Sequence, residues 1–119
     1  MNFKKISILT ISFLFLMIIA SSIKGSSIPK VYVLTLDKVI HFIEYCILGF
    51  FLIKTFSSVS KYPSALGLIV GVFYSFSDEL YQSTVFGRSS SVFDVIADVV
   101  GLAFSVIIVK FLFKSYFYD

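Results

Sequence analysis

The chain of 119 residues contains no tryptophan, a single cysteine, two prolines and few charges. The lone cysteine, Cys46, excludes a disulfide within the chain, and its apolar neighbours favour a small buried side chain over a reactive thiol. Charged residues make up 14% of the sequence, against about 25% in a typical soluble domain. The scarcity of charge therefore excludes an ordinary soluble domain.

Hydrophobic residues instead account for 58% of the chain, and most of them lie in four long runs. A helix that crosses a bilayer needs about 20 predominantly apolar residues, and each run approaches that length. We therefore expect an all-α, polytopic membrane protein, a single four-helix transmembrane bundle over residues 1–119 with short loops, multi-pass in a bacterial cell membrane. The expected helices are approximately 6–23, 39–56, 64–81 and 92–113.

The first segment has a second interpretation. Lys4 and Lys5 precede an apolar run that ends in Ala20, Ser21 and Ser22, a pattern similar to a secretory signal peptide. The run is long for a signal peptide, and more membrane-like sequence follows it rather than a soluble domain. We therefore favour a retained transmembrane helix.

The distribution of Lys and Arg predicts the orientation, because cytoplasmic loops carry an excess of both. With the N-terminus inside, the inner side carries Lys4, Lys5, Lys54, Lys61, Lys110 and Lys114, and the outer side Lys24, Lys30, Lys38 and Arg88. We expect both termini in the cytoplasm. Since these basic residues are dispersed at segment ends, the net charge of +3 does not indicate nucleic-acid binding.

Six of the seven acidic residues lie in or beside the apolar segments, all near the predicted outer surface: Asp37, Glu44, Asp78, Glu79, Asp94 and Asp98. A charged side chain costs about 2.5–3.5 kcal/mol at the centre of a bilayer on insertion scales. Such residues therefore mark a site or a paired contact.

In the second segment Asp37, His41, Glu44 and Leu48 follow helical spacing and form one stripe, flanked by Tyr45. Asp37 has a second interpretation, since a carboxylate at a helix N-terminus also serves as a cap.

In the third segment Gly67, Gly71 and Ser75 recur every four residues, a spacing typical of closely packed membrane helices. The stripe continues into polar residues and should turn Asp78, Glu79 and Gln82 towards the interior. Whether the glycine face packs within one protomer or between two stays open, and so does the oligomeric state.

The fourth segment carries Asp94, Asp98, Gly101 and Ser105 on one stripe. Asp98 lies about 9 Å inside the start of the span by helix rise, so we expect it to be paired, protonated or metal-bound. In the preceding connection Arg88 is suited to binding a carboxylate or a phosphate, and it also has an alternative role in neutralising Asp94 or Glu79.

Together these residues resemble the pattern of VanZ-like membrane proteins, in order and with suitable spacing: Asp37-Lys38-x-x-His41-x-x-Glu44-Tyr45, Glu79-x-x-Gln82, Gly87-Arg88 and Asp94-x-x-x-Asp98-x-x-Gly101. The Ser21-Ser22 pair ahead of Pro29 is also similar to the family's first segment. The resemblance implies a small transmembrane bundle. It further implies a link to teicoplanin, a glycopeptide antibiotic that targets cell-wall precursors, because the family is named for a protein of low-level resistance to it. Asp98 stands where other members often have Asn.

The first functional interpretation is an outer-face polar pocket that binds or acts on an anionic head group of a lipid-linked cell-wall intermediate. Its candidate acid–base residues are Glu79, Asp94 and His41, and its candidate binding residues are Arg88, Lys38, Gln82, Glu44 and Asp98. Mg²⁺ suits carboxylates bridging to a phosphate, whereas His41 and Glu44 are too few for a zinc site. Catalysis and binding both remain open.

Two alternatives belong to other classes. In one, the polar groups pair with each other and hold the helices together without any substrate, so that the protein is structural. In the other, the carboxylates relay protons in a small transport module. The transport alternative is weaker, because the polar residues cluster near one surface and nothing comparable continues to the other.

Overall fold

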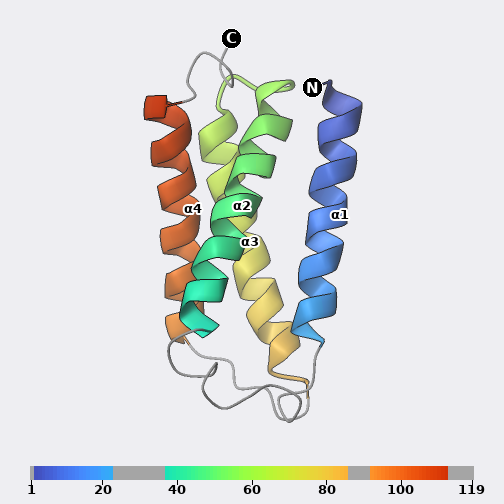
Figure 1. Cartoon of the computed structure of the whole chain (residues 1–119), viewed down its shortest axis with the longest axis vertical. Coiled ribbons are helices and arrows are strands. Elements are labelled where there is room, and N and C mark those ends of the chain that lie inside the picture. Colours follow the sequence, from blue (N-terminus) through green and yellow to red (C-terminus); the bar gives the residue numbers. More distant parts are fainter. Residues whose placement is uncertain (1, 23–36, 86–91, 113–119) are drawn as a thin grey trace.

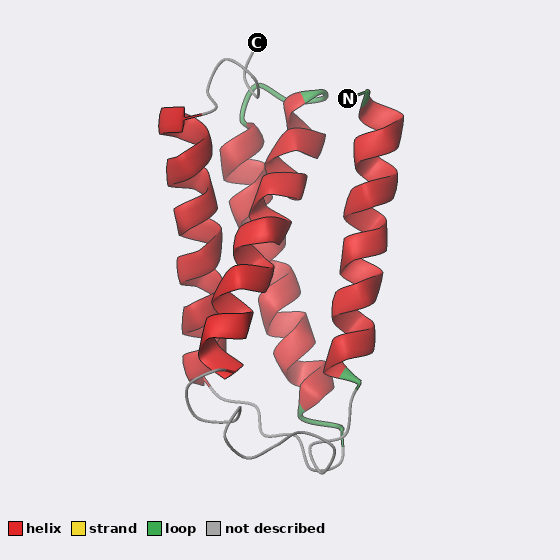
Figure 2. Ribbon diagram, viewed as in Figure 1, coloured by secondary structure: helices red, strands yellow, loops and turns green. Residues whose placement is uncertain are grey.

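The computed structural model describes residues 2–22, 37–85 and 92–112, and all regular structure within them is α-helical (Figure 2). The helices are α1 (Phe3–Ser21), α2 (Asp37–Ser57), α3 (Pro63–Gln82) and α4 (Val92–Leu112). The expectation of an all-α chain is confirmed in this described part. The predicted helix ends differ from the observed ones by at most three residues, at the start of α1.

Local sequence explains where two of the helices begin. The Asn2 side chain caps α1 by accepting a 2.9 Å hydrogen bond from the backbone N–H of Lys5. Helix α3 begins at Pro63, whose missing N–H costs nothing in the first turn of a helix. The predicted role of Pro63 is confirmed. The side chain of Asp37, a candidate cap for α2, lies outside the described residues.

Consecutive helices run in opposite directions (Figure 1). Helices α1 and α3 end, and α2 and α4 begin, at the same end of the bundle, which we call the polar end. The opposite end holds the start of α1 and the end of α4. Helix α2 contacts each of the other three, whereas α1 packs mainly on α2 and only lightly on α3.

The outer surface of the bundle is apolar. Helices α1, α2 from Lys38, and α4 are each long and apolar enough to cross a membrane, and α3 is not among the helices that meet this measure. Helix α3 nevertheless exposes large apolar side chains, and Phe73 is 75% exposed. A surface of this kind suits lipid rather than water, so we treat the chain as a multi-pass membrane protein.

Small residues allow the helices to approach closely. A Cβ at Gly101 of α4 would collide with the carbonyl oxygen of Phe42 in α2, and one at Gly67 of α3 would lie 3.0 Å from Cγ1 of Ile53 in α2. The predicted close contact of the glycine stripe is therefore realised within one chain.

Beyond the polar end, towards the opposite end of the bundle, the interior becomes apolar, with Leu48 and Leu102 in one core cluster and Ile53 and Val109 in a second.

Candidate functional site

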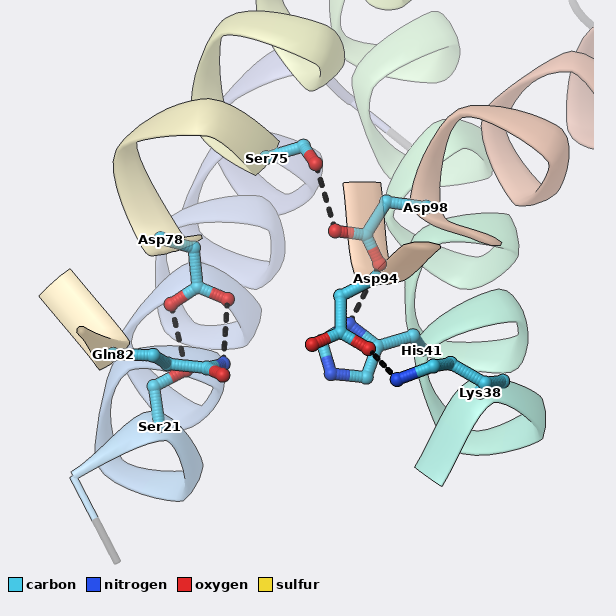
Figure 3. A network of polar contacts seen from close by, with 8 residues as sticks. All are labelled: Ser21, Lys38, His41, Ser75, Asp78, Gln82, Asp94 and Asp98. Atoms are coloured by element: carbon cyan, nitrogen blue, oxygen red, sulfur yellow. Dashed lines mark hydrogen bonds and ion pairs between the residues drawn. The ribbon is translucent and has the colours of Figure 1, made fainter. Parts of the chain in front are cut away.

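Buried polar side chains from all four helices gather at the polar end of the bundle (Figure 3). They form two hydrogen-bonded groups. The central group joins α2, α3 and α4, and the side group joins α1 and α3. The members of the central group are Lys38, His41, Ser75, Asp94 and Asp98, and those of the side group are Ser21, Asp78 and Gln82.

Asp98 links three helices of the central group. Its Oδ1 lies 2.8 Å from Nδ1 of His41 on α2, and its Oδ2 accepts a 2.7 Å hydrogen bond from the Ser75 hydroxyl on α3. The Asp98 side chain is fully buried. Both carboxylate oxygens have partners, so of the three expected states, paired, protonated or metal-bound, the structure shows pairing.

The second contact of the central group is an ion pair. The Lys38 ammonium donates to the carboxylate of Asp94, one turn before Asp98 on α4. The side chain of Lys38 is 33% exposed, whereas that of Asp94 is 1% exposed. The cation therefore reaches from the surface of the polar end to a buried acid.

The side group holds the otherwise lightly packed α1 against α3. The Ser21 hydroxyl donates a 2.6 Å hydrogen bond to Oδ1 of Asp78. Nε2 of Gln82 donates to the Ser21 oxygen at 3.2 Å and to Oδ2 of Asp78 at 3.4 Å. The polar contacts thus compensate for the sparse side-chain packing between the two helices.

Glu79 differs from the other clustered acids. It is only 8% exposed, and neither of its carboxylate oxygens has a hydrogen-bond donor among the described residues. Its close neighbour is the carboxyl group of Asp94. Two carboxyl groups in contact need a shared proton or an outside donor, because two carboxylates offer only acceptors and repel each other. Glu79 therefore lacks an outside donor among the described residues, and the buried hydroxyl of Tyr45 also has no hydrogen-bond partner there.

The structure confirms most of the predicted interior positions. Asp78, Glu79 and Gln82 all face inwards, as do His41, Asp94 and Asp98. On α2 the buried stripe passes through Tyr45, and Glu44 is only partly buried beside it. The sequence predicted Glu44 in the stripe and Tyr45 beside it, and the structure shows the opposite. The helix has 3.6 residues per turn, and here the position four residues after His41, Tyr45, is the one that faces the interior. Arg88 lies outside the described residues.

Two hydrogen-bonding residues were not among the predicted site residues. Ser75 was assigned only a small packing role, and it donates to Asp98. Ser21 was noted only within the Ser21-Ser22 pair, and it donates to Asp78. The signal that could have identified both is a serine within an apolar helix that also carries acids or packs near them. The hydroxyl of such a serine needs a partner once it is away from water.

Comparison with known proteins places the chain in a family. The VanZ/LLP1 family model matches residues 1–114. The chain belongs to the VanZ-like family. No curated protein and no solved structure matches it. The residues that carried the resemblance in this VanZ-like protein, where described, meet at one end of one bundle.

The described part of this VanZ-like protein contains no group of three or more His, Cys, Asp or Glu side chains placed to hold a metal ion. We therefore derive no step through a metal. The arrangement provides a buried carboxyl pair, Glu79 and Asp94, next to an ion pair at the surface. It is suited to accepting hydrogen bonds or to holding and moving a proton.

Proposed function

We propose that this VanZ-like protein binds the head group of a lipid-linked cell-envelope intermediate at its polar end, in the outer leaflet of the cell membrane. The observation that carries the proposal is the buried carboxyl group of Glu79, which lies beside the carboxyl group of Asp94 and receives no hydrogen bond from a hydroxyl, amide or cationic side chain among the described residues. A buried polar group without a partner costs about 1–3 kcal/mol, so its retention favours a role in binding or catalysis over a role in stability alone.

The head group of such an intermediate has two kinds of polar part. Its sugar or peptide part offers hydroxyl and amide donors, which suit the acceptor oxygens of Glu79. Its phosphates are anionic, and the partly exposed Lys38 at the polar end is suited to them. Arg88 is the second proposed phosphate ligand, by its chemistry alone.

Binding has stronger support than catalysis. His41 and Asp98 are paired at 2.8 Å, so these two side chains are already engaged with each other. Glu79 with the adjacent Asp94 remains as the candidate acid–base pair. In a cell exposed to teicoplanin, a protein that binds cell-wall precursors in this way would change susceptibility to the antibiotic.

The test replaces Glu79 with Gln, which keeps the size and removes the carboxyl. The protein is purified in gentle detergent with native lipids, and the lipids that it retains are identified by mass spectrometry. We expect wild type to retain a phosphorylated, sugar-bearing envelope lipid and E79Q to retain about tenfold less, the equivalent of 1.4 kcal/mol. Ser77→Ala is the control, because Ser77 is an exposed residue of α3 whose hydroxyl bonds only to its own helix at Phe73.

Both variants, E79Q and Ser77→Ala, should accumulate in the membrane at the wild-type level. If wild type retains no such lipid in any gentle detergent, the binding proposal is wrong. Equal lipid retention by wild type and E79Q would show that Glu79 takes no part in binding the lipid.

A structural role is the second candidate, and the side group favours it. Asp78 and Gln82 are satisfied by each other and by Ser21, and they join α1 to α3 without any ligand. Under this alternative E79Q would lower the amount of folded protein rather than ligand retention. A proton-coupled transporter has less support, because the described core beyond Asp98 is formed mainly by apolar residues such as Leu48, Leu52 and Leu102.

A further inference from the structure

An open hollow lies at the end of the bundle opposite the polar end. It is a cavity of about 380 Å³, lined by residues 61–65 at the start of α3 and by Val106 and Lys110 of α4. Its volume is within the range of small-ligand sites, which is roughly 300–1,000 Å³. The chemistry of its lining is different from that of the polar end.

Most of the lining is apolar, and its two charged residues are both cationic. Lys61 and Lys110 approach the cavity from two different segments of the chain. None of the acidic side chains in the described residues lines it, since those of α2, α3 and α4 lie at or near the polar end. The ligand that complements this charge is an anion.

The start of α3 adds donors to the same cavity. The N-cap residue Tyr62 makes no side-chain capping bond, and Pro63 has no N–H. In an α-helix the first N–H groups lack partners within the helix, and here those of the first turn belong to Ser64 and Ala65, which both line the cavity. Backbone N–H groups at a helix start bind phosphate, because they point along the positive end of the helix dipole.

The Ser64 hydroxyl is a further group without a partner. Its oxygen is buried and makes no hydrogen bond within the described residues. Because Ser64 lines the cavity, an anion bound there would offer this hydroxyl an acceptor if the side chain adopted a rotamer directed at it. Two lysines and the first-turn residues Ser64 and Ala65 thus line one hollow.

We infer that this cavity is a binding site for a terminal phosphate group, independent of the function proposed for the polar end. Two sources offer that group: the head group of phosphatidic acid in the adjacent leaflet, and soluble inorganic phosphate. Phosphatidylcholine offers only a phosphodiester that is shielded by a choline, so it serves as the comparison lipid.

The test measures both sources with the purified full chain. In lipid nanodiscs of phosphatidylcholine with phosphatidic acid, native mass spectrometry compares the retention of the two lipids. In detergent without lipid, the unfolding temperature is measured with inorganic phosphate and with chloride at matched ionic strength. We compare wild type with K61Q/K110Q, and with K4Q/K5Q, which removes the same charge from the same end at lysines outside the cavity.

We expect wild type and K4Q/K5Q to retain phosphatidic acid selectively, and K61Q/K110Q to lose at least about tenfold of that retention, since two charge-assisted contacts disappear. Ser64→Ala, which keeps both lysines, should lose several-fold. Stabilisation by inorganic phosphate without retention of phosphatidic acid would support the same site with a soluble ligand.

Two results would overturn the inference. One is that neither phosphatidic acid nor inorganic phosphate affects wild type. The other is that both double variants lose retention equally, which would mean that general surface charge attracts the lipid.

Discussion

At the scale of single residues, Asp98 shows that charge and hydrogen bonding are separable requirements. Its two oxygens serve His41 and Ser75, so its position in the apolar interior depends on having two partners. An asparagine has the same shape, and its amide still forms two hydrogen bonds, because the Ser75 hydroxyl is able to accept as well as donate. An Asn at this position is therefore compatible with the same fold.

The prediction that follows compares Asp98→Asn with Asp98→Ala. D98N should change the free energy of unfolding by less than about 1 kcal/mol, because both contacts survive. D98A should destabilise by about 1–3 kcal/mol, because it leaves the buried His41 and Ser75 groups without an acceptor. Reversible unfolding in mixed micelles measures both. Equal losses would show that the negative charge itself, and not the hydrogen bonds, stabilises the site.

At the scale of helices, the sequence predicted well whatever depends on periodicity. The four segments and the inward-facing stripes of α3 and α4 follow from hydrophobic runs and helical spacing. The pairing of individual side chains did not follow, because spacing gives the face of a helix and not its partner. Asp78 and Glu79 are neighbours on α3, yet Asp78 bonds to Ser21 of α1 and Glu79 lies beside Asp94 of α4.

The seams between helices allow a prediction from two glycines. Gly101→Ala places a methyl group against the backbone carbonyl of Phe42, and it would lie 3.1 Å from the backbone nitrogen of Cys46. Backbone cannot move aside without shifting α2, so we expect a loss of about 1–3 kcal/mol.

Gly67→Ala is the matched control. Its methyl group would meet chiefly Cγ1 of Ile53 at 3.0 Å, a side-chain atom that needs to move only slightly. Alanine also favours a helix by up to about 1 kcal/mol over glycine, so we expect a loss of less than about 1 kcal/mol. Unfolding in mixed micelles compares the two variants. A larger loss of stability in G67A than in G101A would contradict the close backbone contact of α4 with α2 at Gly101.

At the scale of the whole molecule, the two ends of the bundle have opposite chemistry. The acids gather at the polar end, and the other end carries lysines, among them Lys4, Lys5, Lys61 and Lys110. The excess of lysine predicts that the second end faces the cytoplasm. The proposed ligands depend on this orientation, since an envelope intermediate is reached from the outer leaflet and only if the polar end is there.

Single cysteines test the orientation. In a Cys46→Ala background, Ser58→Cys and Thr84→Cys place a thiol in the exposed turns after α2 and α3, at opposite ends of the bundle. A membrane-impermeant maleimide should label T84C in intact cells and S58C only after permeabilisation. The reverse pattern would put the polar end in the cytoplasm and move the proposed envelope ligand to the inner leaflet. The apolar outer face of α3 leads us to expect that this helix crosses the membrane. Labelling of both cysteines from the same side would mean that it does not.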